Sequence, residues 1–504
     1  MTAVWVLGDQ LSRERGPLAD DPDRVLFVEA SEFARRRRYH PQKLTLVFAA
    51  MRNLADDLRA DGVDVVYERA DSFAAGLDAY FDAHPGDELV VQRPATHGAA
   101  DRLRELVTER GGSLRVVENE QFLCSPDDFD EWADDRDGDA YSHEAFYRWM
   151  RRETGYLLTD GDPEGGEWNY DEQNRETPPD DYESAPLPEF EYGERVPEVR
   201  EWVAAEFDTW GDPDGFGWPV ARQHAERALD DFLDHRLAEF GPYEDAMLAD
   251  DWHLDHSLLS AALNVGLLGP REVVEAAISA YREREDIPLH SVEGFVRQVV
   301  GWREFVRHVY RREMPELADA NQLDQTRELP PLYWDPDATE MACVGTAVGR
   351  VHDRGYTHHI ERLMVLSNFA LLYGTSPQAL NEWFYGGFVD AFHWVVTPNV
   401  VGMGSFGTAA FTTKPYAASA NYVDRMSDFC AGCRYDPDST TGADACPFNS
   451  LYWDFLAARE DDLRANHRMG LVYSHLDDKR DAGDLAAIRE RADAVRSRAA
   501  SGDL

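Results

Sequence analysis

Four of the five cysteines in this 504-residue chain lie in its last third, at spacings that suit a metal centre. They are Cys343, Cys430, Cys433 and Cys446, in the pattern C-x86-C-x2-C-x12-C. Thiolates are soft, charged ligands, and four of them can hold a tetrahedral zinc ion or an iron–sulfur cluster. Because Cys343 comes from a separate stretch, the centre would join two parts of the fold. Spacing alone favours a 4Fe–4S cluster only slightly over zinc, and four buried thiols are the simpler alternative.

A histidine pair, His358-His359, lies between the first of these cysteines and the others. Adjacent histidines point in different directions on a helix, so the two do not easily serve one metal. One buried and one surface histidine is the simpler interpretation, and the functional alternative is a proton donor. His253 and His256 lie upstream, three residues apart, where a capped helix start at Ser257 explains the region without a metal.

Residues 402–407 spell G-x-G-x-x-G, the letters of a dinucleotide fingerprint. That fingerprint needs a strand before it and a helix after it, and residues 412–415, Thr-Thr-Lys-Pro, do not start a helix. The run therefore predicts a loop in which two backbone segments come close together. Another conspicuous run, the four arginines at 35–38, is interpreted as a solvated helix end.

The first 130 residues alternate short apolar runs with amphipathic helical patterns. This alternation predicts a doubly wound parallel sheet, an α/β fold. The first strand runs into Leu7-Gly8-Asp9-Gln10-Leu11-Ser12, at the carboxyl edge where ligands of such sheets bind. The expected strands lie near residues 3–7, 24–28, 63–67, 88–91 and 114–117.

The remainder of the chain divides into a connector and a helical part. Residues 131–220 are rich in Asp, Glu, Gly and Pro and are expected to form a long linker. From residue 221 to residue 504 one helical pattern follows another, which predicts an all-α domain. The expected helices include residues 222–239, 257–267, 270–283, 291–312, 359–372 and 377–385.

The charge balance is extreme, because 96 acids stand against 50 bases and leave a net charge of −46. A hydrophobic share of 43% is that of a folded protein. We interpret the acidity as adaptation to a cytoplasm with very high salt, as in a halophile, where self-repulsion is screened. It disfavours nucleic-acid binding in dilute buffer, although a local arginine patch can still bind DNA. No apolar run is long enough for a membrane span and no leader is apparent, so we expect a cytoplasmic protein.

Several sequence runs together resemble the photolyase/cryptochrome superfamily. Within it the chain is most similar to the prokaryotic iron–sulfur branch, that of the bacterial cryptochromes and (6-4) photolyases. The similarity extends over nearly the whole chain, and the four-cysteine spacing is its most specific part. The other runs are LGDQLS at 7–12, SLLSAALN at 257–264, GFVRQ at 294–298, GWRE at 301–304, HHIER at 358–362, KPYAAS at 414–419 and LYWDF at 451–455.

The resemblance implies an antenna-type α/β domain joined by a long linker to an all-α, FAD-binding domain that contains an iron–sulfur site. It implies a 4Fe–4S cluster on the four cysteines. It also places a 6,7-dimethyl-8-ribityllumazine antenna, found in some relatives, at Asp9, Gln10 and Glu32. The residues expected to hold FAD are Tyr243, Ser257, Leu258, Leu259, Ser260, Gln298, Arg303, Glu304, Arg362 and Asp390.

The implied activity is that of a DNA photolyase, a lyase that repairs UV-damaged DNA under blue light. The (6-4) pyrimidine photoproduct is the expected lesion, flipped out of the duplex and repaired by electron transfer from excited, reduced FAD. His359, rather than His358, is the expected acid, and Trp383 and Trp334 are expected to pass electrons. We expect a monomer.

Two positions depart from the family pattern. Phe384 stands where relatives carry Tyr, and Val396 stands where relatives carry an acid beside the flavin. Both changes keep open the alternative of a cryptochrome-like blue-light photoreceptor without repair. A light-independent nucleic-acid-binding module, stapled by the metal centre, is a third possibility.

Overall fold

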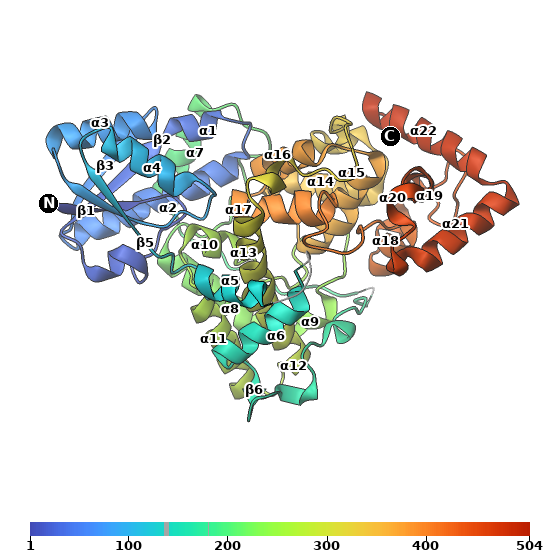
Figure 1. The fold of residues 1–504 in the computed structure, drawn as a ribbon, viewed down its shortest axis with the longest axis horizontal. Helices are drawn as coiled ribbons and strands as arrows, with labels where there is room; N and C mark the ends of the chain where they lie inside the picture. The colour runs from blue at the N-terminus through green and yellow to red at the C-terminus, as the bar shows by residue number, and fades with distance from the viewer. Residues whose placement is uncertain (136–140, 180) are drawn as a thin grey trace.

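The N-terminal part of the chain is a five-stranded parallel sheet (Figure 1). The structure is a computed structural model that describes residues 1–135, 141–179 and 181–504. The strand order β3-β2-β1-β4-β5 is that of a doubly wound sheet. All five predicted strands are confirmed, as β1 (Thr2–Val6), β2 (Arg24–Ala30), β3 (Asp64–Ala70), β4 (Glu88–Gln92) and β5 (Ser113–Val117).

Helices cover both faces of this sheet because successive strand residues point to opposite sides. In β1, Val4 and Val6 pack toward α2 (Pro41–Ala60), the long helix on one face. Ala3 and Trp5 face the other side and join the core formed with α3 (Phe73–Ala83) and α4 (Ala99–Thr108). The α/β fold predicted from the sequence is therefore present.

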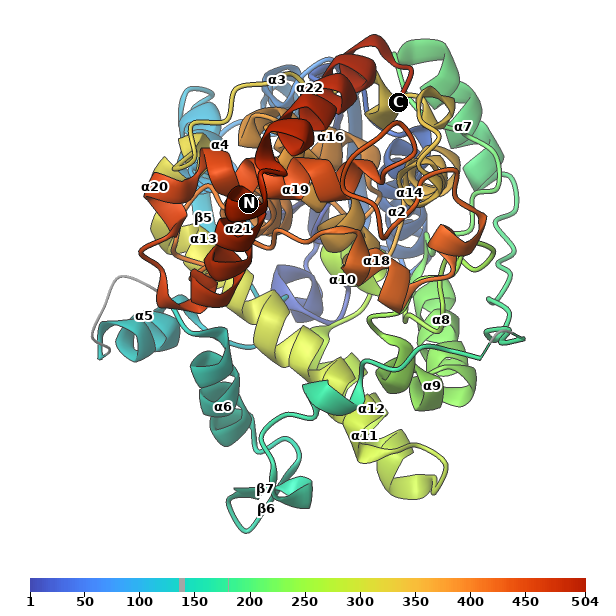
Figure 2. The ribbon, with the colours of Figure 1, turned by 90° about the vertical axis from the view of Figure 1, so that its right-hand side faces the viewer.

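The middle of the chain wraps around both halves of the molecule (Figure 2). It contains α5 (Pro126–Asp134), α6 (His143–Thr154), the hairpin β6 (Leu158–Thr159) and β7 (Asp162–Pro163), and α7 (Arg195–Glu206). Helix α7 packs on α2 of the sheet domain, whereas α6 packs on the helical part, against residues 297–303. This stretch therefore holds the two halves in register.

The rest of the chain is helical, as predicted, apart from connecting loops and turns. No helix in the described ranges is both long and apolar enough to cross a membrane. The α-helices are α8 (Arg222–His235), α9 (Leu237–Tyr243), α10 (Ser260–Val265), α11 (Pro270–Glu283), α12 (Leu289–Val296), α13 (Glu304–Glu313), α14 (Ala342–Arg354), α15 (Asn368–Tyr373), α16 (Pro377–Gly387), α17 (His393–Thr397), α18 (Ala420–Met426), α19 (Pro447–Ala458), α20 (Glu460–Leu463), α21 (Gly470–Ala482) and α22 (Leu485–Ser501).

Three π-helical segments interrupt these helices, and such segments are frequent at functional sites. They are η4 (Arg297–Arg303), η8 (Glu361–Ser367) and η9 (Pro398–Gly404). Segment η9 contains the first half of the predicted glycine loop, residues 402–404. A Cβ on Gly407, in the second half, would lie 2.8 Å from the Ala320 carbonyl oxygen, so glycine is required for this approach. The prediction of close backbone approach is confirmed, although the first half of the run is π-helical rather than a loop.

The four-arginine run lies at the end of a helix, and Arg35, Arg36 and Arg38 are exposed, so the interpretation as a solvated helix end is confirmed. Arg37 Nε lies 2.7 Å from a carboxylate oxygen of Glu382 on α16. Arg38 Nε lies 3.3 Å from Asp208, just after α7. The run ends α1 (Ser31–Arg35) and ties the sheet domain to the rest of the chain by ion pairs between segments far apart in sequence.

Candidate flavin and lesion site

The four predicted metal-binding cysteines converge on one apolar cavity. Cys343 lies in the first turn of α14, Cys430 and Cys433 lie in and just after the 3-10 turn η10 (Phe429–Gly432), and Cys446 immediately precedes α19. Burial raises the pKa of Cys446 to about 12, and the neighbouring thiol of Cys433 adds to this. Ionising these buried thiols together is unfavourable unless a cationic centre neutralises their charge. Their burial therefore fits a metal site. The other lining residues are Met341, Ala420, Val423, Phe429, Tyr435 and Phe448.

The donor set fits a metal centre, because thiolates bind both zinc and iron–sulfur clusters. In the described ranges, only His256, His358 and His359 form a group of three possible ligands with all ligand atoms within 4.8 Å of one another. The four thiols converge on the cavity without forming so tight a group.

Arg362 and Asp390, both predicted to contact FAD, form a buried ion pair beside η8. The two guanidinium nitrogens of Arg362 lie 3.0 Å from Oδ1 and Oδ2 of Asp390, a bidentate arrangement. The Ser260 hydroxyl donates to Asp390 Oδ2 at 2.7 Å, and the Asn264 amide donates to the Asp390 carbonyl at 2.9 Å. The structure thus brings together three predicted FAD residues, Ser260, Arg362 and Asp390, and orients the carboxylate.

A cavity of about 120 Å³ adjoins the predicted flavin-phosphate segment and has the chemistry of a diphosphate site. Arg236 and Arg354 line it together with Ser257 and Leu258. Burial lowers the pKa of both arginines, and Arg236 Nε has no hydrogen-bond partner. Arg236 also pairs with Asp231 at 3.0 Å, whereas Arg354 has no carboxylate oxygen within 4.0 Å among the described residues. Two guanidinium groups beside a hydroxyl fit the phosphates of FAD. Arg236 and Arg354 were missed from the sequence, where nothing separates them from other arginines.

Backbone strain marks the same segment. Leu254, Asp255 and Leu258 have φ angles of +37°, +59° and +56°, which non-glycine residues rarely adopt. The Tyr182 hydroxyl donates a hydrogen bond to the Asp255 carboxylate. The Tyr182 ring packs on that of Tyr243, a predicted FAD residue, with ring centroids 4.8 Å apart. Strain of this kind clusters where a fold clamps a ligand.

Arg303 and Glu304, also predicted to hold FAD, form hydrogen bonds to the segment that follows the sheet domain. The Glu304 carboxylate accepts from the backbone N–H groups of Leu123 and Cys124 at 2.9 and 3.0 Å. Arg303 donates to the Gln121 carbonyl at 2.8 Å. These bonds position residues 121–124. Gln298 lies in the same π-helical segment as Arg303, and Leu259 is buried at the start of α10.

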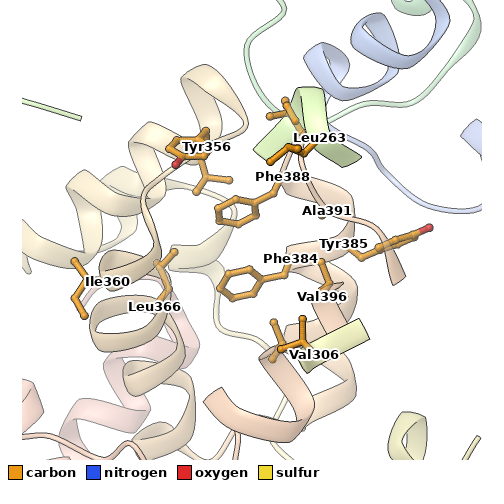
Figure 3. Close-up of a cluster of buried hydrophobic side chains, with 14 of the residues drawn as sticks. Leu263, Val306, Tyr356, Ile360, Leu366, Phe384, Tyr385, Phe388, Ala391 and Val396 are labelled. Carbon is orange, nitrogen blue, oxygen red and sulfur yellow. The ribbon is translucent and has the colours of Figure 1, made fainter. Parts of the chain in front are cut away.

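Both positions that depart from the family pattern lie in an apolar wall (Figure 3). Phe384 and Phe388 stack with ring centroids 4.9 Å apart, and Val396 lies beside Phe384. The Arg362 guanidinium lies 4.4 Å from the centroid of the Phe388 ring, so this wall adjoins the Arg362–Asp390 pair. Neither Phe384 nor Val396 can give or accept a proton here.

The two histidines of the predicted pair have different environments. His358 is fully buried, and neither ring nitrogen has a hydrogen-bond partner among the described residues. Burial, together with the nearby His256, His359 and two arginines, lowers the pKa of His358 well below its usual range. The neutral form of His358 is therefore favoured, which makes it the less suitable acid of the pair. The side chain of His359 is 46% exposed, and its Nε2 lies 3.4 Å from Asp245 Oδ1.

His256 fixes the tautomer of His359. Its Nδ1 lies 2.8 Å from the His253 carbonyl, which can only accept, so Nδ1 carries the proton. Burial, followed by the neighbouring His359, lowers the pKa of His256 to about 3, so its Nε2 stays unprotonated. That nitrogen lies 3.3 Å from His359 Nδ1 and accepts from it. The proton that a charged His359 can release therefore lies on Nε2. The expectation that a helix start accounts for His256 was incomplete.

Asp245 completes this group. Burial would raise its pKa, but the hydrogen bond and charge of His359 outweigh that effect, and the pKa of Asp245 is lowered. An ionised carboxylate beside an imidazole favours its charged form. Nothing in the sequence separates Asp245 from the other acids, of which the chain has 96 in all.

The two predicted electron carriers are joined by a third tryptophan. Trp210, in the linker, has its ring centroid 6.0 Å from that of Trp383 and 5.4 Å from that of Trp334. The exposed fraction rises along the series, from 2% for Trp383 through 7% for Trp210 to 39% for Trp334. The three rings form a continuous path from the core beside Phe384 to the surface. Trp210 was missed because it lies in a segment read as a connector.

The predicted antenna residues lie at the carboxyl edge of the sheet. Burial raises the pKa of Asp9 to about 6. Gln10 donates to the Gln92 carbonyl at 2.9 Å, and Glu32 accepts from the Phe73 backbone N–H at 3.3 Å. Both side chains already have structural partners.

A buried lysine was missed at this edge. Lys43 Nζ donates to the carbonyls of Tyr385 and Ala391 at 2.6 and 2.5 Å, and burial lowers its pKa to about 7. It has no carboxylate partner within 4.0 Å in the described ranges. The rarity of lysine was the signal available in the sequence, since Lys43 is one of three lysines in the chain.

Comparison with known proteins supports one family. A family model for deoxyribodipyrimidine photo-lyase-related protein matches residues 4–218. The (6-4) photolyase of Agrobacterium fabrum is 39% identical over 482 residues, which cover 94% of each chain. A bacterial class III photolyase from Agrobacterium tumefaciens has a TM-score of 0.59 at 18% identity, over 84% of this chain and 86% of that one. An archaeal photolyase from Sulfolobus tokodaii has a TM-score of 0.56 at 14% identity, over 86% and 88%.

The two solved structures, at this low identity, support the fold alone. The Agrobacterium fabrum protein supports the family assignment, because 39% identity extends over nearly the full length of both proteins. The chain belongs to the photolyase/cryptochrome family, whose members bind FAD. Within that family it is similar to a protein named as a (6-4) photolyase.

Proposed function

We propose that this protein is a DNA photolyase that repairs (6-4) pyrimidine photoproducts under blue light. The observation that carries the proposal is the half-exposed His359, whose Nδ1 faces His256 and whose Nε2 faces Asp245. Breaking a (6-4) lesion requires a hydroxyl group to move between bases, and this step needs an acid. A relative named as a (6-4) photolyase, 39% identical over 94% of the chain, supports the choice of lesion.

The residues around Asp390 and those that line the cavity beside Ser257 would hold FAD. When bound and reduced, this group supplies the light-driven electron donor. Arg362 and Ser260 orient the Asp390 carboxylate, while Arg236, Arg354 and Ser257 would face the phosphates. The apolar wall of Phe384, Phe388 and Val396 excludes water from this side of the site.

His359 would act on the lesion from the other side. Its Nε2 proton passes to the departing hydroxyl, and Asp245 stabilises the charged imidazole before that transfer. His256 accepts at Nε2 only, so it keeps the ring of His359 in one orientation throughout. His358, neutral and buried, stacks on His256 with ring centroids 4.6 Å apart and supports it.

The remaining assignments follow the same reasoning. We assign the four cysteines to a structural 4Fe–4S cluster, and Asp9, Gln10 and Glu32 to a lumazine antenna site that Lys43 adjoins. Residues 1–130 would form the antenna domain, residues 131–220 the linker and residues 221–504 the catalytic domain. A monomer in the cytoplasm, acting on UV-damaged DNA, is consistent with this organisation.

A light-dependent repair assay tests the proposal. Protein loaded with FAD and reduced is mixed, in concentrated KCl, with an oligonucleotide that carries one (6-4) lesion. We expect illumination with blue light to restore the two bases, and darkness to leave the lesion intact. Repair of a cyclobutane dimer instead would overturn the choice of lesion. A flavin-loaded, light-responsive protein that repairs neither lesion would be a photoreceptor, the alternative that Val396 and Phe384 favour.

Replacing Trp210 by phenylalanine is expected to slow light-driven reduction of the bound flavin by an external thiol. Removal of the middle ring leaves a gap between Trp383 and Trp334, so we expect a loss of about tenfold or more, equivalent to about 1.4 kcal/mol in the barrier. Absorption changes under blue light measure the rate. Trp202→Phe is the matched control, because Trp202 lies in the same linker but packs on Phe48 and Phe207. Equal rates in both variants would remove Trp210 from the path.

A further inference from the structure

Arg350 is a buried arginine that the proposed mechanism does not use. It lies near the end of α14 and is 7% exposed. Burying a guanidinium group is unfavourable unless its charge and its N–H donors are satisfied. The groups that bind Arg350 therefore show which segments of the fold this side chain joins.

The Arg350 guanidinium bridges two segments that are far apart in sequence. Its Nη1 donates to the Glu361 carboxylate, and its Nη2 donates to the Leu248 carbonyl and, at 2.8 Å, to the Ala249 carbonyl. Glu361 is fully buried in η8, directly after the helical turn that follows the histidine pair. Leu248 and Ala249 follow Asp245 in the chain. One side chain thus joins the segment of the proposed acid to the segment of its carboxylate partner.

The Glu361 end of this bridge reaches the histidines. Glu361 Oε1, the atom that accepts from Arg350, lies 3.7 Å from His358 Nε2. Burial raises the pKa of Glu361 to about 7, and the charge of Arg350 opposes this effect. His359 follows His358 directly, so the Arg350–Glu361 pair fixes the start of η8 beside the backbone that carries both histidines.

The other end of the bridge holds a segment without regular secondary structure. Residues 244–249 lie outside the helices and strands. On one side, the Met247 N–H donates to the Met426 carbonyl at 2.9 Å, and the Ala249 N–H donates to Asp428 Oδ1 at 2.8 Å. On the other side, Arg350 donates to two of the carbonyls. The segment that carries Asp245 is therefore held from both sides, and Arg350 provides one of them.

Arg350 has a firm base in the elements that carry the cysteines. Cys343 lies in the first turn of the same helix, α14. The Arg350 guanidinium lies 5.9 Å from the centroid of the Phe429 ring, and Phe429 is next to Cys430 in η10. The proposed metal centre would join α14 and η10, so the base of Arg350 would not move when the neighbouring loop does.

We propose that Arg350 is a positioning residue for the acid, which keeps the Asp245 carboxylate beside His359. The inference rests on the proposed repair function. Asp245 Oδ1 lies 3.4 Å from His359 Nε2, and a carboxylate at this distance favours the charged imidazole. Without the bonds to Leu248 and Ala249, the segment is free to shift, and small displacements of a positioned group have large effects on rate.

This arrangement makes repair depend on pH in a definite direction. At low pH His359 is protonated without help, whereas at higher pH the Asp245 carboxylate is needed to keep the proton on it. A displaced Asp245 therefore lowers repair most at high pH. The titratable groups that face His359 are Asp245, Glu244, His256 and His358, and Arg175 and Arg297 act on Asp245.

The test compares Arg350→Gln with Arg52→Gln in concentrated KCl. The control breaks a buried pair of the same kind in the sheet domain, where Arg52 lies 2.7 Å from Glu29. In FAD-loaded protein without DNA, we expect the amides of residues 244–249 to exchange hydrogen about tenfold faster in Arg350→Gln and at the parent rate in the control. We expect repair by Arg350→Gln to fall about fivefold or more at about pH 8, and less than about twofold at about pH 6.

Two further variants separate positioning from loss of folding. Arg350→Gln leaves Glu361 buried without its partner, which is destabilising. The double variant with Arg350→Met and Glu361→Gln removes both charges, and it should show the same faster exchange at residues 244–249. Glu361→Gln alone keeps the donors to Leu248 and Ala249, so this segment should exchange as in the parent.

Each outcome decides the proposal. Exchange at the parent rate in both Arg350 variants would overturn the positioning role. Faster exchange with an equal loss of repair at both pH values would overturn the route through Asp245 and His359. A parent protein that repairs neither lesion would overturn the proposed function, and the exchange rates would then decide by themselves whether Arg350 holds the segment of Asp245.

Discussion

Replacing His359 by alanine is expected to lower light-dependent repair about 100-fold or more, the lower end of what a positioned acid contributes. His359 is the exposed member of the histidine group, whereas burial lowers the pKa of His256 and that of His358. Without it, the departing hydroxyl must take a proton from water. The repair rate of FAD-loaded, pre-reduced protein measures the effect.

The variant should otherwise behave as the parent does. The His359 side chain is 46% exposed and packs little, so flavin content and thermal midpoint are expected to stay the same. His235→Ala, a change at an exposed histidine at the end of α8, is the matched control and should repair normally. Asp245→Asn gives a graded check, because it keeps the shape but removes the charge that favours a protonated His359. Retained repair in His359→Ala would refute its role as the acid.

The sheet and the helical half could be predicted because their signals are local. Strands such as β2 are short and uniformly buried, and helices such as α2 begin at a proline after a polar residue. The four cysteines could be predicted because a thiol is rare in this chain and its chemistry is specific. His359 could be predicted as the acid only from its neighbour His358 together with a family resemblance. Spacing alone favoured one buried and one surface histidine.

What sequence reasoning missed depends on contacts between distant segments. Trp210, Asp245 and Lys43 are ordinary residues until folding places them beside Trp383, His359 and Ala391. The four-arginine run is a largely exposed helix end, as predicted, but the partner of Arg37, Glu382, lies hundreds of residues away and could not be foreseen from the local sequence.

Replacing Cys343 by serine is expected to remove the metal centre and to lower the free energy of unfolding by about 5 kcal/mol or more, a fraction of what structural metal sites contribute. Cys343 is on α14, whereas the other three ligands are on η10 and beside α19. The centre therefore closes a contact between elements about 90 residues apart in sequence. Denaturant unfolding, with iron and sulfide analysis of the purified protein, measures both effects.

The fifth cysteine provides the control for this experiment. Cys124 is buried far from the others in sequence, and its thiol donates to the Ser125 carbonyl at 3.4 Å, a bond that a serine hydroxyl can replace. Cys124→Ser should keep the iron and change stability by about 1 kcal/mol or less. Equal losses in Cys124→Ser and Cys343→Ser would mean that burial of a thiol, not a metal centre, accounts for the effect. Zinc in place of iron in the parent protein would contradict the proposed cluster.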